Sequence, residues 1–429
     1  MLDQKRKAVY TAILEEELIP AMGCTEPIAI AYAGALARKI LGAMPDVVEL
    51  TVSGNIIKNV KSVIVPHTSG RKGIPCAVAA GICVGDPDQK LEVLAHVNDD
   101  QLAEMDRFLK TTKITIKESD APCPFDIQVL VHHEEDNAYV RIIGSHTNVV
   151  SMRHGEQVLV DRPISDQGIS VSSNRQLLNV EDIVAYADTV DVNEVRAVLQ
   201  RQIDVNMAIA QEGMNEKYGA KIGKILLHAY GTGVQNRAKA YAAAGSDARM
   251  NGCEMPVVIN SGSGNQGMTT SIPVIIYAQE CHASQEQLYR ALIVSNLVTI
   301  HLKNGIGSLS AYCGATSAGA GAGAGVCYLY GGRYREIAHT IVNALAINSG
   351  MLCDGAKASC AAKIASAVEA GLLGMQMYMH DSEFYCGEGL VAKNVEETIR
   401  AFSTIAREGM RSTDSEIIHF MIHGDMVKS

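Results

Sequence analysis

The sequence contains no tryptophan, and aromatic residues of all kinds make up only 5% of its 429 residues. Proteins that stack nucleobases or hold carbohydrates in grooves depend on aromatic faces, so neither function is expected. An excess of basic residues is absent too, because 37 Lys and Arg stand against 47 Asp and Glu, a net charge of −10. Phosphate binding requires clustered cations, and this balance therefore excludes a nucleic-acid partner.

No secretory signal is expected either. Residues 1–20 are charged and amphipathic, without an apolar stretch or a cleavage site, so we expect a cytoplasmic protein. The 11 cysteines are an odd number in a reducing compartment, and we therefore expect no disulfide framework. Some are expected to be small buried apolar residues, and a few are candidates for holding a metal.

The uncharged run from Asn304 to Gly332 does not indicate a membrane partner. Its residues are small, whereas a spanning helix needs roughly 20 predominantly apolar residues. The five glycines between Gly314 and Gly325 cost a helix about 1 kcal/mol each relative to alanine, which only tertiary packing can offset. We therefore expect a helix buried on all sides, in close contact with neighbouring backbones. Such glycine-rich helices also suggest a homodimer.

The spacing of apolar residues changes along the first third of the chain. Residues 5–18 and 28–41 have helical periodicity, and the GCTEP segment, Gly23 to Pro27, lies in the turn between them. From Val47 onward, apolar and polar residues alternate with a period of two in short segments rich in β-branched residues. These segments, KSVIVP at 61–66 among them, are predicted to be strands. Residues 91–109 are predicted to be helical.

Beyond Glu181 the helical periodicity returns and continues almost to the end of the chain. The sequence therefore predicts an α+β fold. A mostly helical catalytic domain is expected to comprise residues 1–45 and 166–429, and a smaller α/β domain is expected to be inserted at 46–165.

Three cysteines occur in contexts that suit a metal centre. Cys353 and Cys360 belong to CDGAKASCAAK, in which Asp354 is a good N-cap for an alanine-rich helix. Seven residues of ideal helix span about 10.5 Å, but a helix that starts at Asp354 lets the chain bend and bring the two sulfurs together. Cys313 precedes the small-residue helix, and Gly314 after it leaves room for a bulky inorganic group.

Dispersed thiolates of this kind differ from the compact cysteine run of ferredoxins. Three ligands on a four-iron cluster leave one iron open, and an open iron is a Lewis acid that can bind a substrate carboxylate and a leaving group. The N–H groups of a helix start would stabilise such an anionic centre. From the residues alone, buried structural thiols explain any one of these cysteines equally well.

Two segments rich in glycine and hydroxyl groups suit the binding of a small anion. NSGSGNQG follows the apolar run MPVVI, and its backbone can form a nest for a carboxylate or a phosphate, although a polar turn has the same composition. Its candidate substrate-binding residues are Asn260, Ser261, Gly262, Ser263, Gly264 and Asn265. In VPHTSGRKGIP, Thr68, Ser69 and Gly70 are candidates for orienting a substrate, and His67 is a candidate for proton transfer.

Two lysines are further candidates for substrate binding. Lys303 and the nearby His301 enter a very apolar segment, which suggests that they face the site, although a surface position is the alternative. Lys357 lies at the predicted start of a helix, where a cation is unfavourable, so an anionic partner such as substrate or cluster would explain it.

Four separated segments, GCTEP, SDARMNGCEMPVVINSGSGNQG, HLKNGIGSLSAYCG and CDGAKASCAAK, resemble those of the iron-sulfur L-serine dehydratase alpha-chain family. The resemblance is closest to the L-cysteine desulfidase branch of that family, for which it runs from Cys24 to about Ala370. It implies that Cys313, Cys353 and Cys360 hold a [4Fe-4S] cluster.

The resemblance also assigns Cys24 a role near the cluster, as a base or as a removable fourth ligand, with a packing role as the alternative. Its position at a helix start is expected to lower the pKa of its thiol. Serine dehydratases carry a serine-rich SSSHT motif near their start, whereas GSHT lies here at 144–147 among strands, so that role is not transferred. This departure favours cysteine over serine as the substrate.

We therefore expect a cluster-dependent α,β-elimination that converts a small amino acid, L-cysteine, to pyruvate, ammonia and sulfide. One alternative is a dehydratase of L-serine or a related β-hydroxy amino acid. Another is pyridoxal-phosphate chemistry, with Lys303 or Lys357 forming the Schiff base. The third is a non-catalytic amino-acid or metal sensor whose cysteines bind zinc.

Overall fold

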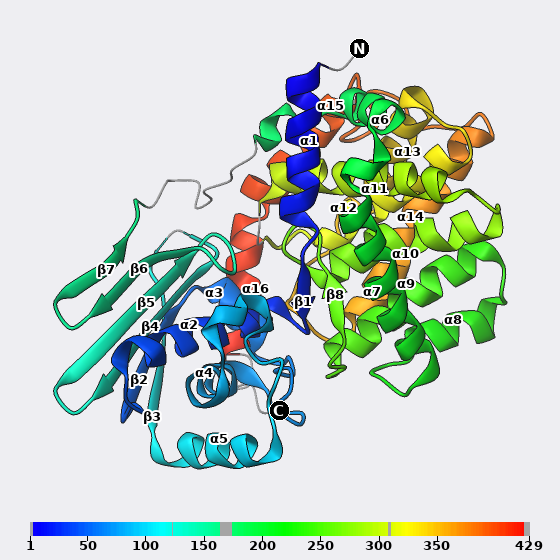
Figure 1. Cartoon of the computed structure of the whole chain (residues 1–429). Helices are drawn as coiled ribbons and strands as arrows, with labels where there is room; N and C mark the ends of the chain where they lie inside the picture. Colours follow the sequence, from blue (N-terminus) through cyan, green and yellow to red (C-terminus); the bar gives the residue numbers. More distant parts are fainter. Residues whose placement is uncertain (1–2, 122, 164–173, 308–309, 424–429) are drawn as a thin grey trace.

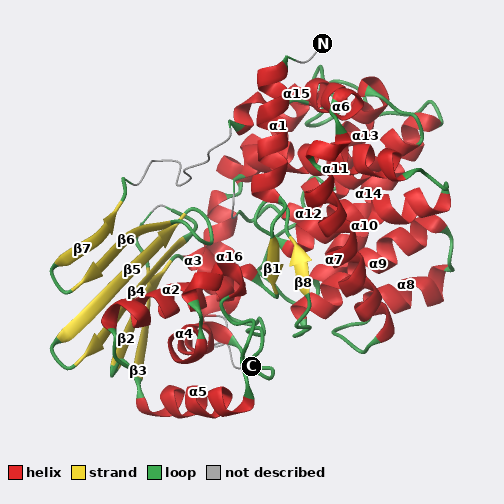
Figure 2. Cartoon of the chain, viewed as in Figure 1, coloured by secondary structure: helices red, strands yellow, loops and turns green. Residues whose placement is uncertain are grey.

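The computed structural model describes residues 3–121, 123–163, 174–307 and 310–423. Within these ranges it is an α+β structure, which confirms the predicted fold class. Figures 1 and 2 show strands β2 to β7 on one side of the molecule and a larger, helical assembly on the other. We call the sheet together with helices α2 to α5 the sheet part, and the assembly of α1 and α6 to α15 the helical part.

Strands β2, β4 and β5 of the sheet part alternate buried and more exposed side chains, as the sequence predicts. In β2 (Val47–Val52), Val48, Leu50 and Val52 are buried. The strand order is β3-β2-β4-β5-β6-β7, in which β2 and β3 are parallel and the other neighbouring pairs are antiparallel. The other strands are β3 (Lys113–Glu118), β4 (Asp126–His133), β5 (Asp136–Ile143), β6 (Val149–His154) and β7 (Gln157–Asp161).

Helix α2 (Thr25–Leu41) packs on β4 and β5 and also contacts α4 (Gly73–Val84). The two helices are in backbone contact, because a Cβ added at Gly81 would lie 2.0 Å from the carbonyl oxygen of Ala31. Thus α2, which the predicted division assigns to the helical domain, contacts the sheet. The domain boundaries stay a prediction.

The helical part is built from long helices connected by short turns. Outside α2 and α4, the chain has these helices: α1 (Gln4–Glu17), α3 (Gly54–Val60), α5 (Asp99–Thr111), α6 (Val180–Thr189), α7 (Arg196–Asn215), α8 (Ile222–Tyr230), α9 (Val234–Met250), α10 (Gly264–Glu280), α11 (Gln285–Ile306), α12 (Gly314–Leu329), α13 (Tyr334–Ile347), α14 (Cys360–Met379), α15 (Val395–Thr404) and α16 (Arg411–His423). Short helical turns are η1 (Pro87–Glu92), η2 (Arg175–Leu177), η3 (Val192–Glu194) and η4 (Ile405–Gly409).

Helix α12 lies at the centre of the helical part, in contact with α10, α11, α13 and α14. Every residue from Ala315 to Tyr328 is buried, which confirms the prediction of a helix enclosed on all sides. A Cβ added at Gly319 would lie 2.2 Å from the carbonyl oxygen of Ala367 on α14. The glycines of α12 therefore make their close contacts inside this chain, and the homodimer stays a prediction.

A small antiparallel pair of strands joins the beginning of the chain to its middle. Strand β1 (Pro20–Met22) pairs with β8 (Pro256–Val258), and the N–H of Ile259 donates to the carbonyl of Ile19 at 3.0 Å. The segment after β1 leads into α2, and the segment after β8 leads into α10. This pairing therefore places the GCTEP turn beside the NSGSGNQG loop.

Two local predictions are wrong, and two helices were not predicted. Residues 61–66 form turns instead of a strand, and an isolated bridge between Ile64 and Lys72 closes this loop. The sequence analysis also missed α3 and α4, whose small residues suit close helix packing more than a sheet face. The helix predicted at 91–109 begins only at Asp99, because Asn98 forms a capping box there.

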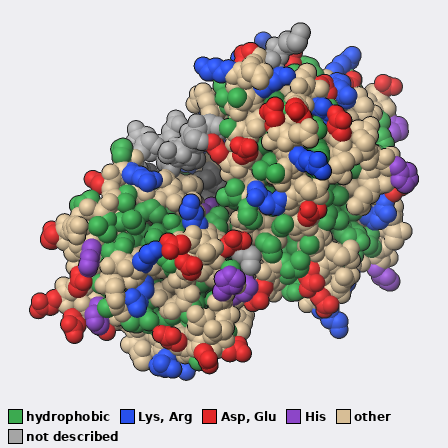
Figure 3. Space-filling view, viewed as in Figure 1, with side chains coloured by type: hydrophobic (Ala, Val, Ile, Leu, Met, Phe, Trp, Pro, Cys, Tyr) green, Lys and Arg blue, Asp and Glu red, His purple; other side chains and the backbone are tan. Residues whose placement is uncertain are grey.

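None of the helices in the described ranges combines the length and apolarity needed to cross a bilayer. On the face seen in Figure 3, acidic and basic side chains are interspersed over both parts of the molecule. This distribution agrees with the charge balance of the sequence.

Candidate active site

The structure brings the three candidate ligand cysteines together. The N–H of Cys313 donates to the carbonyl of Met351 at 3.0 Å, and the N–H of Cys353 donates to the carbonyl of Ala311 at 2.6 Å. These bonds place Cys313 and Cys353 side by side, and their thiols are close enough to shift each other's pKa in opposite directions. Cys360 lies near enough to interact electrostatically with both. Their role as ligands stays a prediction.

The interaction between the two thiols makes them unequal. The thiol of Cys313 lowers the pKa of Cys353, and the positive charges of Lys58 and Lys303 lower it further, against the effect of burial. The pKa of Cys313 is raised by the same interaction and by burial. Of the two, Cys353 is the thiol whose surroundings favour the anionic form that binds a metal.

Helix N-termini add positive potential at these thiols. Cys313 is the N-cap of α12, Cys360 is the first residue of α14, and Cys24 is the N-cap of α2. Each helix start presents unpaired N–H groups and about half a positive charge. The three helix starts together favour an anion at this place.

Buried lysines surround the same thiols. Lys303 on α11 is 5% exposed, and burial lowers its pKa to about 8, although the nearby Cys353 and Cys313 oppose the shift. This agrees with the expectation that Lys303 faces the site. His301 pairs with Glu396 on α15, its Nε2 lying 2.8 Å from a carboxylate oxygen, and its place at the site stays a prediction.

The loop between Cys353 and Cys360 differs from its prediction. Helix α14 begins at Cys360, not at Asp354, because Gly355 adopts a left-handed φ of +90° and Asp354 caps no helix. A Cβ at Gly355 would lie 2.4 Å from the carbonyl oxygen of Lys58 on α3. The two cysteines are therefore at the ends of a loop, so the length of seven helical residues does not separate them.

Asp354 holds this loop through two lysines. Its carboxylate lies 2.5 Å from the ammonium of Lys357 and also pairs with Lys363 on α14. Lys363 donates in addition to the carbonyl of Leu352 at 2.7 Å. Lys357 therefore lies in a loop and not at a helix start, which makes that expectation wrong, and its ammonium pairs with Asp354. Its role in substrate binding stays a prediction.

Cys24 lies close to this group. It is 2% exposed and packs with Val63 and Met250 in a small apolar cluster, against which Cys360 also lies. Gly23, with φ +52°, lets the chain turn there. The structure thus brings the GCTEP segment to the cysteines of the C-terminal half.

The protonation of Cys24 differs from its prediction. Burial raises the pKa of its thiol, and the charge of Glu26 raises it further, whereas Arg249 opposes the shift. The thiol donates to Glu26 at 3.3 Å, and the amide of Asn59 donates to the same carboxylate at 3.2 Å. The predicted lowering by a helix start is wrong, since burial and an anionic neighbour outweigh the helix dipole.

Part of the NSGSGNQG loop is used inside the protein. The side-chain amide of Asn260 donates to Asn296 at 2.9 Å in the core, and the hydroxyl of Ser261 donates to Asn260 at 2.9 Å. The N–H of Ser261 donates to Glu17 at 2.9 Å, and Ser263 is the N-cap of α10. These contacts fix the shape of the loop.

Other atoms of this loop are buried without a partner. They include Oδ1 of Asn265 and Oε1 of Gln266, a residue that the sequence analysis did not single out. The side chain of Gln266 packs on Gly314, where an added Cβ would lie 2.6 Å from its Cδ. Gln266 therefore joins this loop to the residue after Cys313, and its unpaired atom is available to a ligand.

The turn formed by His67 to Gly70 is only partly directed inward. His67 has Nδ1 3.4 Å from Glu254, and its Nε2 is buried without a partner. The hydroxyl of Thr68 donates to a carbonyl of its own turn at 2.7 Å. Ser69 and Gly70 are exposed. Of this set, His67 has the atom best placed to receive a ligand.

A further histidine was missed by sequence reasoning. His146 belongs to the GSHT string between β5 and β6, yet its Cε1 lies 3.2 Å from the Cβ position of Gly262. Its Nε2 is buried without a partner. Burial lowers the pKa of His146, the charge of Glu26 raises it, and the charge of Arg249 lowers it. The GSHT string thus reaches the NSGSGNQG loop, a contact that no local pattern reveals.

In the described part of the chain, no group of three or more His, Cys, Asp and Glu side chains is arranged to hold a single metal ion. An iron-sulfur cluster has a different requirement, because its thiolates bind separate irons of a larger body. Three thiols among lysines and helix starts have the donor chemistry and the charge that such a cluster needs.

Comparison with known proteins agrees with this architecture. Residues 88–419 match the serine dehydratase alpha chain family. A UPF0597 protein of Desulfitobacterium hafniense is 53% identical over 414 residues, which cover 96% of each chain. A UPF0597 protein of Treponema denticola is 44% identical, with 98% of this chain and 99% of the other covered. The chain therefore belongs to the serine dehydratase alpha-chain family, as the four sequence segments indicated.

Proposed function

We propose that this protein is an iron-sulfur-dependent lyase that eliminates sulfide from L-cysteine and forms pyruvate and ammonia. Membership of the serine dehydratase alpha-chain family supports a lyase of amino-acid catabolism. The observation that carries the cluster is the meeting of Cys313, Cys353 and Cys360 among buried cations. A reducing, cytoplasmic location is part of this proposal, because the thiols must stay reduced.

Cys313, Cys353 and Cys360 would hold a [4Fe-4S] cluster. When bound, it would supply an iron without a protein ligand as a Lewis acid for the carboxylate and the leaving group. The charges of Lys58 and Lys303 and the neighbouring thiol lower the pKa of Cys353, which favours its binding to iron as a thiolate. The lysines and helix starts offset the negative charge of the thiolates.

The reaction needs a base for the α-proton of the substrate. Cys24 is the candidate, because it lies against Cys360 and its thiol donates to Glu26. Burial and the charge of Glu26 raise its pKa, so the thiol must first lose its proton to solvent, and the thiolate so formed is a strong proton acceptor. The α-proton would go to Cys24, the electrons of the C–H bond would form the double bond, and the C–S bond electrons would leave with sulfide. The resulting aminoacrylate becomes an imine, which water hydrolyses to pyruvate and ammonia.

The neighbouring loop would orient the substrate. Asn265 and Gln266 have buried oxygens without partners, which suit the ammonium group of an amino acid. Dehydration of L-serine is the second candidate, favoured by the family to which the chain belongs. The two substrates differ only in the leaving atom, so kinetics must separate them.

The test is anaerobic purification and reconstitution with iron and sulfide, followed by assays of iron content and of pyruvate formed from L-cysteine and L-serine. We expect about four irons per chain and a higher kcat/KM for L-cysteine. Substitution of Cys313, Cys353 or Cys360 by serine should lower the iron content, whereas Cys281→Ser, at an exposed position, should not. A fully loaded protein without turnover would refute the proposed activity, and a band that shifts on adding amine would indicate pyridoxal phosphate.

A further inference from the structure

The C-terminal helix reaches the sheet part beside the candidate active site. In Figure 1, α16 lies between α3 and the helical part. A Cβ added at Gly54, the first residue of α3, would lie 2.9 Å from Cγ2 of Ile418 on α16. The two helices are therefore in direct contact.

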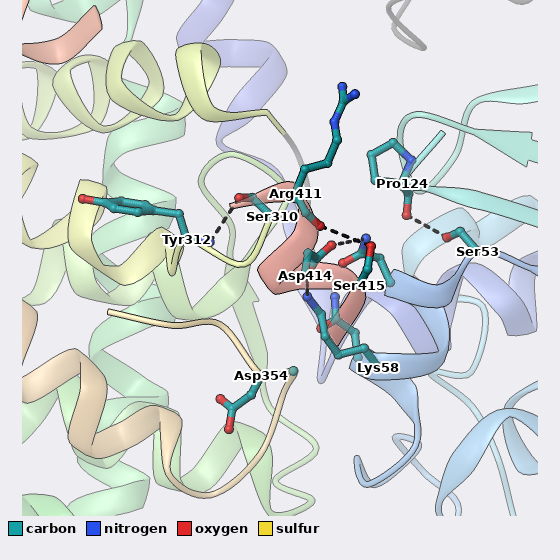
Figure 4. Close-up of polar contacts among 12 residues, drawn as sticks. Ser53, Lys58, Pro124, Ser310, Tyr312, Asp354, Arg411, Asp414 and Ser415 are labelled. Carbon is teal, nitrogen blue, oxygen red and sulfur yellow. Dashed lines mark hydrogen bonds and ion pairs between the residues drawn. The ribbon is translucent and has the colours of Figure 1, made fainter. Parts of the chain in front are cut away.

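A polar clamp forms at this contact. The ammonium of Lys58 donates to Oδ1 of Asp414 at 2.5 Å, and the side-chain amide of Asn55 donates to Oδ2 of the same carboxylate at 2.8 Å. Figure 4 shows Lys58 and Asp414 pointing toward one another from α3 and α16. Both oxygens of Asp414 are thus used to orient residues of a single turn of α3.

Lys58 is the more deeply buried member of the pair. Its side chain is 1% exposed, whereas that of Asp414 is 14% exposed. Burying an ammonium is costly even with one carboxylate partner, and three N–H donors need acceptors. Asp414 accepts one of them. A second anion at this position would satisfy the others.

The position of Lys58 relates it to the thiols. Its charge acts on both Cys353 and Lys303, and its carbonyl oxygen is in contact with Gly355 of the cysteine loop. Lys357, by comparison, is paired with Asp354 in that loop. Lys58 is therefore a buried cation whose backbone lies against the cysteine loop and whose ammonium is held by Asp414.

We propose that Lys58 binds the carboxylate of the amino-acid substrate and that Asp414 is a positioning residue that holds Lys58 in place. The C-terminal helix is then a working part of the active site, although it lies 356 residues from Lys58 along the chain. This inference rests on the proposed function only in that it takes the ligand to be an amino acid.

Binding of L-alanine tests the proposal, because this amino acid has the carboxylate but no leaving group. Calorimetry on the anaerobic, cluster-loaded protein would compare wild type with the double variant Lys58→Met and Asp414→Asn, which leaves no unpaired buried charge. Loss of a charged hydrogen bond should weaken binding by about 10- to 100-fold. Lys58→Arg should recover part of that loss, since it keeps the charge.

The positioning role has its own readout. Asp414→Asn should weaken L-alanine binding by about 3- to 10-fold and raise KM for L-cysteine while leaving kcat and iron content unchanged. Glu416→Gln is the matched control, because Glu416 is an exposed acid on the same helix. Its binding should equal that of wild type.

Several results would overturn the inference. They are a wild-type protein that binds no L-alanine, a double variant that binds it as tightly as wild type, and an Asp414→Asn variant that behaves like Glu416→Gln. Sulfide release from L-cysteine by wild type is assayed separately. Binding that depends on Lys58 without turnover would refute the proposed function alone, and turnover without that dependence would refute this inference alone.

Discussion

Substitution of Gly371 by alanine should destabilise the protein and reduce its iron content. Gly371 lies on α14 where this helix crosses α12, and a Cβ there would lie 2.0 Å from the carbonyl oxygen of Gly319. That oxygen belongs to the backbone, so no side-chain rotation can relieve the overlap. The two helices must therefore move apart.

The size of the effect follows from two opposing terms. Overpacking of this kind costs about 1–3 kcal/mol, and a backbone obstacle places this substitution at the upper end. Alanine gains about 1 kcal/mol over glycine inside a helix. The net loss in the free energy of unfolding is therefore about 2 kcal/mol. Because Cys313 is the N-cap of α12 and Cys360 is the first residue of α14, the same displacement would also separate two candidate ligands.

Urea unfolding followed by circular dichroism, and iron content after reconstitution, would measure both effects. The matched control is Gly233→Ala, at a position with φ −57° and no atom within 4 Å of the added Cβ. The control should change the free energy of unfolding by less than about 1 kcal/mol. A Gly371→Ala variant with unchanged or greater stability and full iron content would refute the reasoning.

Three other substitutions have expected outcomes of known sign. Glu26→Gln should lower the pKa of Cys24, because the charge of Glu26 is second only to burial in raising it. Alkylation of this thiol in cluster-free protein should therefore begin at lower pH. An unchanged pH profile of alkylation would contradict this. Burial raises the pKa of Asp247 to about 6, so the stability that its protonated form contributes is lost as the pH rises through 6. When the pH is lowered from 7 to 5, the free energy of unfolding of wild type should therefore rise by about 1 kcal/mol relative to that of Asp247→Asn, after allowance for solvent screening. Equal pH dependence of the two proteins would contradict this. Lys363→Met should speed the loss of iron to a chelator, because Lys363 secures the loop between two candidate ligands. Lys39→Met, which removes an exposed ion pair with Asp88, should not. Equal rates of iron loss in the two variants would refute the role of Lys363.

Composition and local pattern predicted the buried helix and its start. A run of alanine and glycine has no large apolar face, so it can be stable only where other backbones surround it, as α12 is. The position of Cys313 at the start of that helix followed from the same run. The α+β class followed from the change of apolar period along the chain.

Features set by long-range contact could not be predicted in this way. The start of α14 depends on the left-handed φ of Gly355 and on the pairing of Asp354 with lysines, which compete with helix capping. The raised pKa of Cys24 depends on burial by residues far along the chain. A helix dipole is a local effect, so reasoning from it alone gave the wrong sign.

The small residues of α12 and the chemistry of the candidate site depend on one another. Close packing at Gly319 and Gly371 brings the axes of α12 and α14 together, and both helices begin at a candidate ligand. Larger side chains at these positions would stabilise isolated helices but would move their N-termini apart. Since the positive potential of a helix start falls off within its first turn, that movement would remove both a thiol and part of the field that stabilises its anionic form. The cost of glycine in α12 is therefore offset by the close approach of charges and thiols that only a narrow helix contact allows.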